Sequence, residues 1–502
     1  MGIPKLTLKI FLPLGFLFFY HVQCSQPRPL DPIHNKMTQE ITPSYSEISR
    51  RQFFSHSGKV ATGGALAGLA LPSVHGQSSD LTKLALVGCG GRGTGAASNA
   101  LSVSQSNGPT KLVAMADVYQ SKMERSYNGL INKHKEQVDV PEDRRFIGFD
   151  GYQKAMDVLD PGDVVIFTSP CAFRWVHYEY AIRRGLNVFM EKPVTPDGFA
   201  SRKMLELNEE AKKINLKVGV GLMCRHSQAR QELKARIEDG ELGEILNLRA
   251  YRMQSPIASC FSDKKPAGEN ELMFQISRFH SFLWLSGGSF SDFFIHNIDE
   301  CCWMKGMWPV KCQAQGGRHY RGDKIDQNLD NYTVEYTFPD ETKFYFHGRN
   351  IAGCHQEFSS HAHGTKGYAL ISGPGGHRSQ ARIHKGQGPE SELGWMFGQK
   401  GGSRPARENS PYQEEWEALM DAIKNDKPHN EVERGVQASV VTSMGRMAAH
   451  IGTEVTYDQM LNSDHVFGPG VENLSFESES PLLASAEGTY PIPQPGIKKR
   501  EY

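Results

Sequence analysis

The sequence lacks a charge excess and long hydrophobic runs, and each absence argues against one class of protein. Lys plus Arg and Asp plus Glu both number 56 among the 502 residues, so the formal net charge is zero. That balance argues against a nucleic-acid binder, which usually carries a basic excess. No run of about 18 apolar residues is present, so we expect no membrane-spanning helix. The chain is long enough for two sizeable globular domains.

Paired cysteine motifs are also missing. The nine cysteines form no CxxC pair and their number is odd, with the adjacent Cys301 and Cys302 as the only cluster. This usage favours neither a disulfide framework nor a structural zinc site, and is typical of a chain that folds under reducing conditions. His355, His361 and His363 show no ligand spacing with acids or cysteines, so we expect no metal site.

The first 78 residues are expected to be a targeting region. Residues 1–24 resemble a secretory signal, and a second signal follows between 49 and 76. There Arg50 and Arg51 precede a Gly/Ala-rich apolar stretch, which resembles the twin-arginine export motif. The alternative is a chance pair of arginines before a core helix. Because two tandem signals are redundant, we expect Met37 to be the true start, and a folded protein exported to the periplasm by the twin-arginine route.

A strand followed by a glycine-rich turn comes next. Leu84–Val87 predicts a buried strand, and the turn after it matches G-x-G-x-x-G. In that motif the first glycine makes the turn, the second lets the backbone approach a pyrophosphate, and the third lets helix and strand pack closely. The helix that follows points its N-terminus at the phosphates. The alternative is a glycine-rich turn without a ligand. The candidate cofactor residues here are Gly88, Gly90, Gly91, Arg92 and Gly93.

A second strand, Lys111–Ala116, ends in Asp117, close to the expected spacing of about 20 residues after the motif. A carboxylate there can accept both ribose hydroxyls, and it repels a 2′-phosphate. The sequence therefore favours NAD over NADP as cofactor. The alternative for Asp117 is an ordinary carboxylate at a strand end.

Two more predicted strands, Asp163–Phe167 and Asn187–Met190, flank a helix. Strands and helices that alternate in this way predict a doubly wound parallel sheet, whose ligands bind beyond the carboxyl ends of the strands. His177 lies early in the helix, where it caps the helix or touches a nicotinamide amide. The candidates at the strand ends are Thr168, Pro170, Glu191 and Lys192.

Ser289–Met304 is typical of a helix that carries polar residues on one face. Asp292 and His296 are four residues apart, so they share a face, and Asp299 is close to it. An imidazole beside a carboxylate is a suitable general base, and the ammonium of Lys192 can hold a reacting oxygen. The alternatives are a helix histidine with a structural partner and a surface lysine.

The second half predicts an α+β domain with an open, largely antiparallel sheet. We expect residues 378–407 to be a long surface loop. The Pro/Ser/Glu-rich tail should wrap around the molecule or extend from it. The expected domains are an NAD-binding domain at 79–200, a substrate and oligomerisation domain at 201–465 and a tail at 466–502. The predicted strands are Ile245–Met253, Val310–Arg318, Tyr332–Phe338 and Thr342–Asn350.

Together these motifs resemble the Gfo/Idh/MocA oxidoreductases over roughly residues 80–465. The most specific match is Glu191-Lys192-Pro193 at a strand end; a GG-x(3)-D-x(3)-H-x-x-D segment begins at Gly287. The resemblance implies an N-terminal Rossmann domain followed by the α+β domain, with Lys192 as the catalytic lysine and Asp292 and His296 on the substrate side. It also implies a sugar or cyclitol substrate and a homo-oligomer formed through the C-terminal sheet.

Two departures from the family pattern leave the substrate open. Trp416 stands where related sequences often carry histidine, and the segment around Cys224 replaces a strand that usually ends in arginine and an aromatic residue. Arg225, His226 and Asp299 are tentative substrate ligands. The equal alternative is a structural pairing for Arg225 and His226, and a position on the helix surface for Asp299.

Three functions fit these residues. The first is an exported oxidoreductase that moves a hydride between a sugar, glycoside or cyclitol hydroxyl and a tightly bound nicotinamide cofactor, because free NAD is scarce outside the cytoplasm. The second is an NAD-dependent glycoside hydrolase that oxidises the sugar transiently. The third is a sugar-binding protein without catalysis, which the intact Lys192, Asp292 and His296 disfavour.

Overall fold

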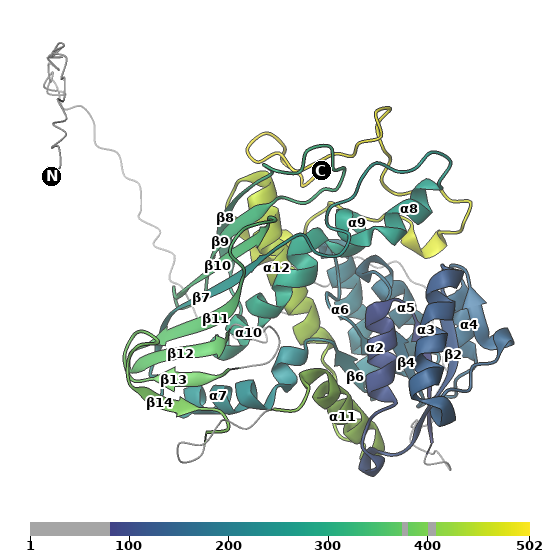
Figure 1. Ribbon diagram of the computed structural model, residues 1–502, viewed down its shortest axis with the longest axis horizontal. Coiled ribbons are helices and arrows are strands. Elements are labelled where there is room, and N and C mark those ends of the chain that lie inside the picture. The colour runs from purple at the N-terminus through teal and green to yellow at the C-terminus, as the bar shows by residue number, and fades with distance from the viewer. Residues whose placement is uncertain (1–80, 374–379, 400–407) are drawn as a thin grey trace, which may run out of the picture. The chain divides into compact units, whose positions relative to one another are not determined.

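The computed structural model describes residues 81–373, 380–399 and 408–502 (Figure 1). The expected twin-arginine signal lies outside the described residues. Within the described part, no helix is long and apolar enough to cross a membrane.

The first sheet has six strands, all parallel, in the order β3-β2-β1-β4-β5-β6. This order is that of the doubly wound dinucleotide-binding fold, so the first part of the predicted fold class is confirmed. The central strands are buried on both faces by helices, which explains their continuous apolar runs. The strands are β1 (Thr82–Val87), β2 (Thr110–Asp117), β3 (Arg145–Ile147), β4 (Val164–Phe167), β5 (Asn187–Met190) and β6 (Val218–Val220).

Helices from both ends of the chain cover this sheet. Trp416 of a late helix stacks on Phe189 of β5 with ring centroids 4.4 Å apart. β6 and this late helix complete the parallel layer from positions beyond residue 200, where the sequence places the end of the NAD-binding domain. The helices are α2 (Gly91–Ala100), α3 (Gln120–Lys133), α4 (Gly151–Asp157), α5 (Arg174–Arg183), α6 (Gly198–Lys213) and α11 (Pro411–Lys424).

The second sheet has nine strands in the order β14-β13-β12-β11-β7-β10-β9-β8-β15. All neighbours are antiparallel except β7 and β10, which run parallel, so the predicted open and largely antiparallel sheet is confirmed. Its strands are β7 (Ile245–Gln254), β8 (Lys311–Gly317), β9 (Asn331–Thr337), β10 (Lys343–Asn350), β11 (Glu357–Gly364), β12 (Gly367–Ser372), β13 (Arg382–His384), β14 (Leu393–Met396) and β15 (Val455–Thr456).

Two helices lie between the sheets (Figure 1). Helix α10 packs on β7 and β11, and α12 packs on β8 as well as on α6 of the parallel layer. The two sheets therefore share one continuous hydrophobic core. The helices of this part are α7 (Gln228–Glu238), α8 (Glu271–Ser277), α9 (Leu283–Ser286), α10 (Ile295–Lys305), α12 (Val432–Ile451) and α13 (Tyr457–Leu461).

The helix predicted over Ser289–Met304 is not uniform. Phe290–Phe294 forms a π-helical turn, and α10 begins only at Ile295. A π-helical turn contains one more residue than an α-helical turn, and such turns often occur at functional sites. Asp292 and His296 are therefore not related by regular α-helical spacing, although both side chains line the same cavity.

The C-terminal region contains a hairpin and a tail that is packed on the rest of the molecule. The expected loop at 378–407 is partly wrong, because β13 and β14 form a hairpin on the edge of the second sheet. The tail wraps back on the molecule instead of extending from it. Leu482, Tyr490 and Glu501 are all buried, at 6%, 6% and 3% exposure.

Candidate active site

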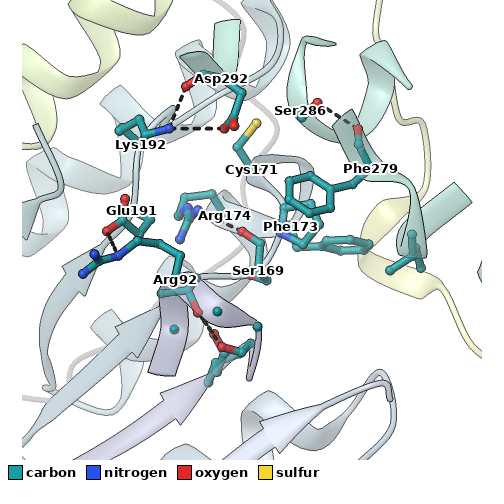
Figure 2. Close-up of a pocket in the computed structure, with 18 of the residues that line it drawn as sticks. Arg92, Ser169, Cys171, Phe173, Arg174, Glu191, Lys192, Phe279, Ser286 and Asp292 are labelled. Atoms are coloured by element: carbon teal, nitrogen blue, oxygen red, sulfur yellow. Dashed lines mark hydrogen bonds and ion pairs between the residues drawn. The ribbon is translucent and has the colours of Figure 1, made fainter. Parts of the chain in front are cut away.

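A cavity of about 520 Å³ opens at the carboxyl ends of the parallel strands and continues to the π-helical turn and β7 (Figure 2). Every residue predicted as catalytic or cofactor-binding lines it. These residues are Gly88, Gly90, Gly91, Arg92, Gly93, Asp117, Thr168, Pro170, His177, Glu191, Lys192, Asp292 and His296.

The glycine-rich turn has the geometry that its motif predicts. Gly88 has a φ of +98°, which side chains other than glycine rarely adopt. A Cβ on Gly93 would lie 2.0 Å from the carbonyl oxygen of Gly88, so helix and strand approach too closely for any side chain there. At Gly90 and Gly91 a Cβ would meet nothing within 4 Å. The turn therefore leaves open space beside the N-terminus of α2, where a pyrophosphate fits.

Asp117 ends β2 beside this turn. One carboxylate oxygen accepts the backbone N–H of Cys89 at 2.6 Å, and the other accepts that of Tyr119 at 2.8 Å. Burial raises the pKa of this carboxyl group, and the two N–H groups and Lys122 oppose that effect. Each oxygen keeps a lone pair for a further donor, so the group can accept the hydroxyls of a ribose.

Arg92 is held in place by a carboxylate. Its Nε lies 2.8 Å from Oε1 of Glu191, and its guanidinium lies over the ring of Tyr412 at 4.7 Å (Figure 2). Gly221 makes room for this pair, because a Cβ there would be 2.7 Å from the Glu191 carboxylate. Glu191 therefore fixes a positive charge beside the space at the glycine turn.

His177 is a neutral, buried histidine. Its ring stacks on Tyr152 with centroids 4.3 Å apart, and Nδ1 lies 3.2 Å from Oγ of Ser169. Burial, with a smaller contribution from the charge of Arg174, lowers its pKa to about 3. The imidazole can therefore offer one N–H and one lone pair, as an interaction with an amide requires.

Lys192 and Asp292 lie side by side in the lining of the cavity (Figure 2). The ammonium of Lys192 donates to the backbone carbonyl of Asp292 at 2.6 Å and lies 3.5 Å from carboxylate oxygen Oδ1. The other oxygen, Oδ2, lies 3.3 Å from Nε2 of His280. Burial alone would raise the pKa of Asp292, but the charge of Lys192 and the hydrogen bond from His280 lower it to about 2. Asp292 is therefore ionised at neutral pH and is a poor proton acceptor.

His280 lines this site and was not predicted from the sequence. It lines the cavity between the rings of Phe279 and Phe293, and its Nδ1 lies 2.9 Å from Oγ of Ser259. It belongs to a short 3-10 turn, Phe279–Ser281, whose sequence has no recognised motif. No spacing rule connects it to Asp292.

The three tentative substrate ligands have structural partners instead. Arg225 makes a two-pronged ion pair with Asp299, with N–O distances of 2.9 and 2.7 Å, and Asp299 is fully buried. His226 lies 3.1 Å from Oε1 of Glu431. None of Arg225, His226 and Asp299 is among the residues that line the cavity. In this structure Arg225 and Asp299 pair with each other and His226 pairs with Glu431.

Within the described part of the chain, no cluster of three or more His, Cys, Asp or Glu side chains has the arrangement of a metal site.

Comparison with known proteins gives one family match and one group of related sequences. Residues 230–370 match the sequence model of the GFO/IDH/MocA C-terminal domain. An inositol 2-dehydrogenase of Corynebacterium glutamicum is 27% identical over 128 residues, which are 26% of this chain and 36% of that protein. The matched segment thus spans little more than a third of that relative.

Solved structures share the fold over most of the chain. An aldose-aldose oxidoreductase from Caulobacter crescentus, in complex with glycerol, has a TM-score of 0.55 at 17% identity. The scyllo-inositol dehydrogenase from Lactobacillus casei with bound NAD(H) and scyllo-inositol has a TM-score of 0.54 at 21% identity. Each alignment covers 75% of this chain and 99% of the other. At these identities the likeness shows the architecture alone.

Proposed function

We propose that this chain is a Gfo/Idh/MocA-type oxidoreductase that transfers a hydride between a CH–OH group of a sugar, glycoside or cyclitol and a nicotinamide cofactor. The observation that carries the proposal is the single cavity that joins the glycine turn and Asp117 to Lys192, Asp292 and His296. The match to the C-terminal domain of that family and the sequence relationship to an inositol 2-dehydrogenase support it.

The residues fit a dinucleotide along the strand ends. Gly90 and Gly91 leave space for a pyrophosphate, and Asp117 has lone pairs for ribose hydroxyls. We favour NAD over NADP because the Asp117 carboxylate would repel a 2′-phosphate. The neutral imidazole of His177 lines the cavity, where it is available to hydrogen-bond a carboxamide. When bound, the nicotinamide supplies the acceptor for the hydride.

The catalytic roles follow from the charges at the other end of the cavity. The ammonium of Lys192 holds the reacting oxygen and stabilises the negative charge that develops on it. Asp292 remains a carboxylate that orients Lys192 and His280. His296, on the same cavity wall, accepts the hydroxyl proton as general base.

Two alternatives receive less support. The named relatives are dehydrogenases and oxidoreductases, which gives no support to a glycoside hydrolase. A sugar-binding protein without catalysis would not need an ammonium, a carboxylate and two imidazoles around one cavity.

Location and assembly extend the proposal. We propose export by the twin-arginine route from the arginine pair at residues 50–51, and a tightly bound cofactor as a consequence of export. We also propose a homo-oligomer that pairs through the nine-stranded sheet.

The experiment that tests the activity is an absorbance spectrum of the purified full chain, saturated with NAD, before and after addition of a panel of sugars and cyclitols. We expect the band of reduced nicotinamide to appear with at least one compound, and to be absent from a Lys192→Met variant that still binds NAD. Absence of the band with every compound, together with no NAD binding, would favour the binding-protein alternative.

A further inference from the structure

Arg252 stands on the buried face of β7, where the core ends and the cavity begins. Leu248 and Ala250 precede it on that face and are fully buried, whereas Arg252 lines the cavity. Its neighbour in β10 is Gly348, and a Cβ on Gly348 would lie 2.3 Å from the ring of Phe294. Because Phe294 belongs to the π-helical turn that carries Asp292, Arg252 lies on the catalytic side of the cavity.

The guanidinium of Arg252 has no carboxylate partner within residues 81–373, 380–399 and 408–502. Its Nε is buried without a hydrogen bond, and the guanidinium lies over the ring of Phe358 at 4.4 Å from the ring centroid. Burial lowers its pKa to about 10, because nearby groups compensate the lost hydration only in part. Arg252 as a whole is half-buried, and a guanidinium whose Nε is desolvated without a counter-charge favours an anion beside it.

The fully buried arginines of this protein have carbonyl or carboxylate partners that compensate the loss of hydration. Arg174 also lacks a carboxylate, but it donates to the carbonyl oxygens of Phe167 and Ser169. Three further arginines each have a carboxylate at 2.8, 2.6 and 2.8 Å: Arg230 with Glu300, Arg321 with Asp326 and Arg446 with Glu501. Arg252 departs from this pattern, and it does so where it faces a cavity.

The protein's own acids near the cavity are already engaged. Glu191 pairs with Arg92, and Asp292 pairs with Lys192. Glu300, the carboxylate whose charge acts on Arg252, pairs with Arg230 at 2.8 Å. The phosphates of a dinucleotide would bind at the glycine turn beside Arg92. The free anion that Arg252 requires is therefore a group on the substrate.

We propose that Arg252 binds an acidic group of the substrate, so that the enzyme acts on an anionic carbohydrate in preference to a neutral sugar or cyclitol. This inference rests on the proposed oxidoreductase function of the same cavity. The planar fork of a guanidinium suits the two oxygens of a carboxylate or a phosphate. The acidic group only binds. The carbinol carbon gives its hydride to the nicotinamide ring, and the hydroxyl proton passes to the base.

The test compares neutral and acidic probes on the full chain loaded with NAD. Glucose, galactose and myo-inositol are the neutral probes, and glucuronate, galacturonate and glucose 6-phosphate are the acidic ones. Binding is measured by titration calorimetry, and kcat/KM by nicotinamide absorbance. The variants are Arg252→Gln and, as matched control on the opposite face of the same strand, Arg249→Gln. The uronates and the sugar phosphate separate a carboxylate from a phosphate as the group recognised.

We expect at least one acidic probe to bind about tenfold or more tightly than its neutral parent, as for a charged hydrogen-bonded pair. Arg252→Gln should remove that preference and leave NAD affinity unchanged, and Arg249→Gln should keep both. Equal binding of neutral and acidic probes to the wild type overturns the inference. So does an Arg252→Gln variant that loses NAD affinity but keeps the preference.

The same data separate this inference from the proposed function. Turnover of neutral sugars without an anion preference leaves the oxidoreductase proposal intact and overturns the role of Arg252. Anion binding that depends on Arg252, without turnover of any probe, supports the subsite and counts against the oxidoreductase.

Discussion

The charge pattern around Asp292 decides which residue can act as the base. Its carboxylate is held between an ammonium and an imidazole, and its pKa is lowered to about 2. The folded-state pKa thus lies below the ordinary value of about 3.9, so Asp292 is ionised above about pH 4 and becomes neutral only as the pH falls through 2. An acid limb of the pH–rate profile between about pH 5 and 8 would belong to a histidine.

We therefore expect an Asp292→Asn variant to lose activity and to retain NAD binding. Lys192 loses its counter-charge and His280 loses its acceptor, so kcat should fall by about 100-fold or more. Steady-state kinetics from pH 5 to 9 and a cofactor titration measure both effects. Asp323→Asn, at an exposed position, is the control. Disappearance of the acid limb in Asp292→Asn would mean that Asp292 itself titrates there and would contradict this assignment.

At the level of residues, sequence reasoning found the part of the site that motifs encode. The glycine turn, Asp117 and Lys192 are tied to strand ends, and strand ends of a parallel sheet converge in space. His280 and Arg252 could not be found in this way, because a 3-10 turn and a strand from the second sheet bring them to the cavity through long-range packing. The roles of Arg225 and Asp299 were left open by the sequence, because spacing cannot show that two charges form an ion pair.

The strand–turn–helix unit from β1 to α2 separates the structural from the functional requirement for glycine. A Cβ on Gly93 would clash with the backbone at 2.0 Å and with Oγ1 of Thr168 at 2.5 Å. A Cβ on Gly90 would meet nothing, and Gly90 has an ordinary φ of −72°. Packing therefore requires glycine at position 93. At position 90 only a ligand in the open space would require it.

We expect Gly93→Ala to reduce the free energy of unfolding by about 1–3 kcal/mol, as overpacking does. Gly90→Ala should leave that free energy nearly unchanged and still weaken NAD binding by about tenfold or more, because the new methyl group occupies the pyrophosphate space. Urea denaturation without cofactor and a fluorescence titration with NAD measure the two quantities. A Gly90→Ala protein that binds NAD like the wild type would show that the pyrophosphate does not bind there.

Elements with strong local signals were predicted closely, and those shaped by their surroundings were not. The strand predicted at Asn187–Met190 is β5 within the same bounds, because its apolar residues are buried on both faces. The π-helical turn at Phe290–Phe294 has an ordinary helical sequence, and Phe290 packs against Tyr332 and Phe346 of the second sheet. The β13–β14 hairpin has a polar, glycine-rich sequence, and it forms because an edge strand is available to pair with.

At the scale of the whole molecule, the end of the described chain joins the two halves of the site. The carboxylate of Glu501 pairs with Arg446 at 2.8 Å and with His450 at 2.9 Å, and all three are buried. Arg446 also donates to Oγ of Ser291, next to Asp292, and to the carbonyl of Pro196, shortly after Lys192. The tail therefore supports both segments that carry the central ion pair, which a compositional description as a Pro/Ser/Glu-rich tail did not predict.

We expect Glu501→Gln to destabilise the fold by about 3 kcal/mol at pH 7, because it leaves Arg446 buried without its counter-charge. Burial would raise the pKa of Glu501, but Arg446 and His450 lower it to about 2, below its unfolded value of about 4.3. The wild type therefore has this stabilisation fully above about pH 5 and loses it as the pH falls toward 2. Urea denaturation at pH 7 and at pH 3.5 measures the difference, with Glu477→Gln at an exposed tail position as control. The gap between the two proteins should be smaller at pH 3.5 than at pH 7 without closing, because pH 3.5 still lies above the folded-state pKa of Glu501. A gap that stays constant between the two pH values would show that Glu501 contributes through packing and not through its charge.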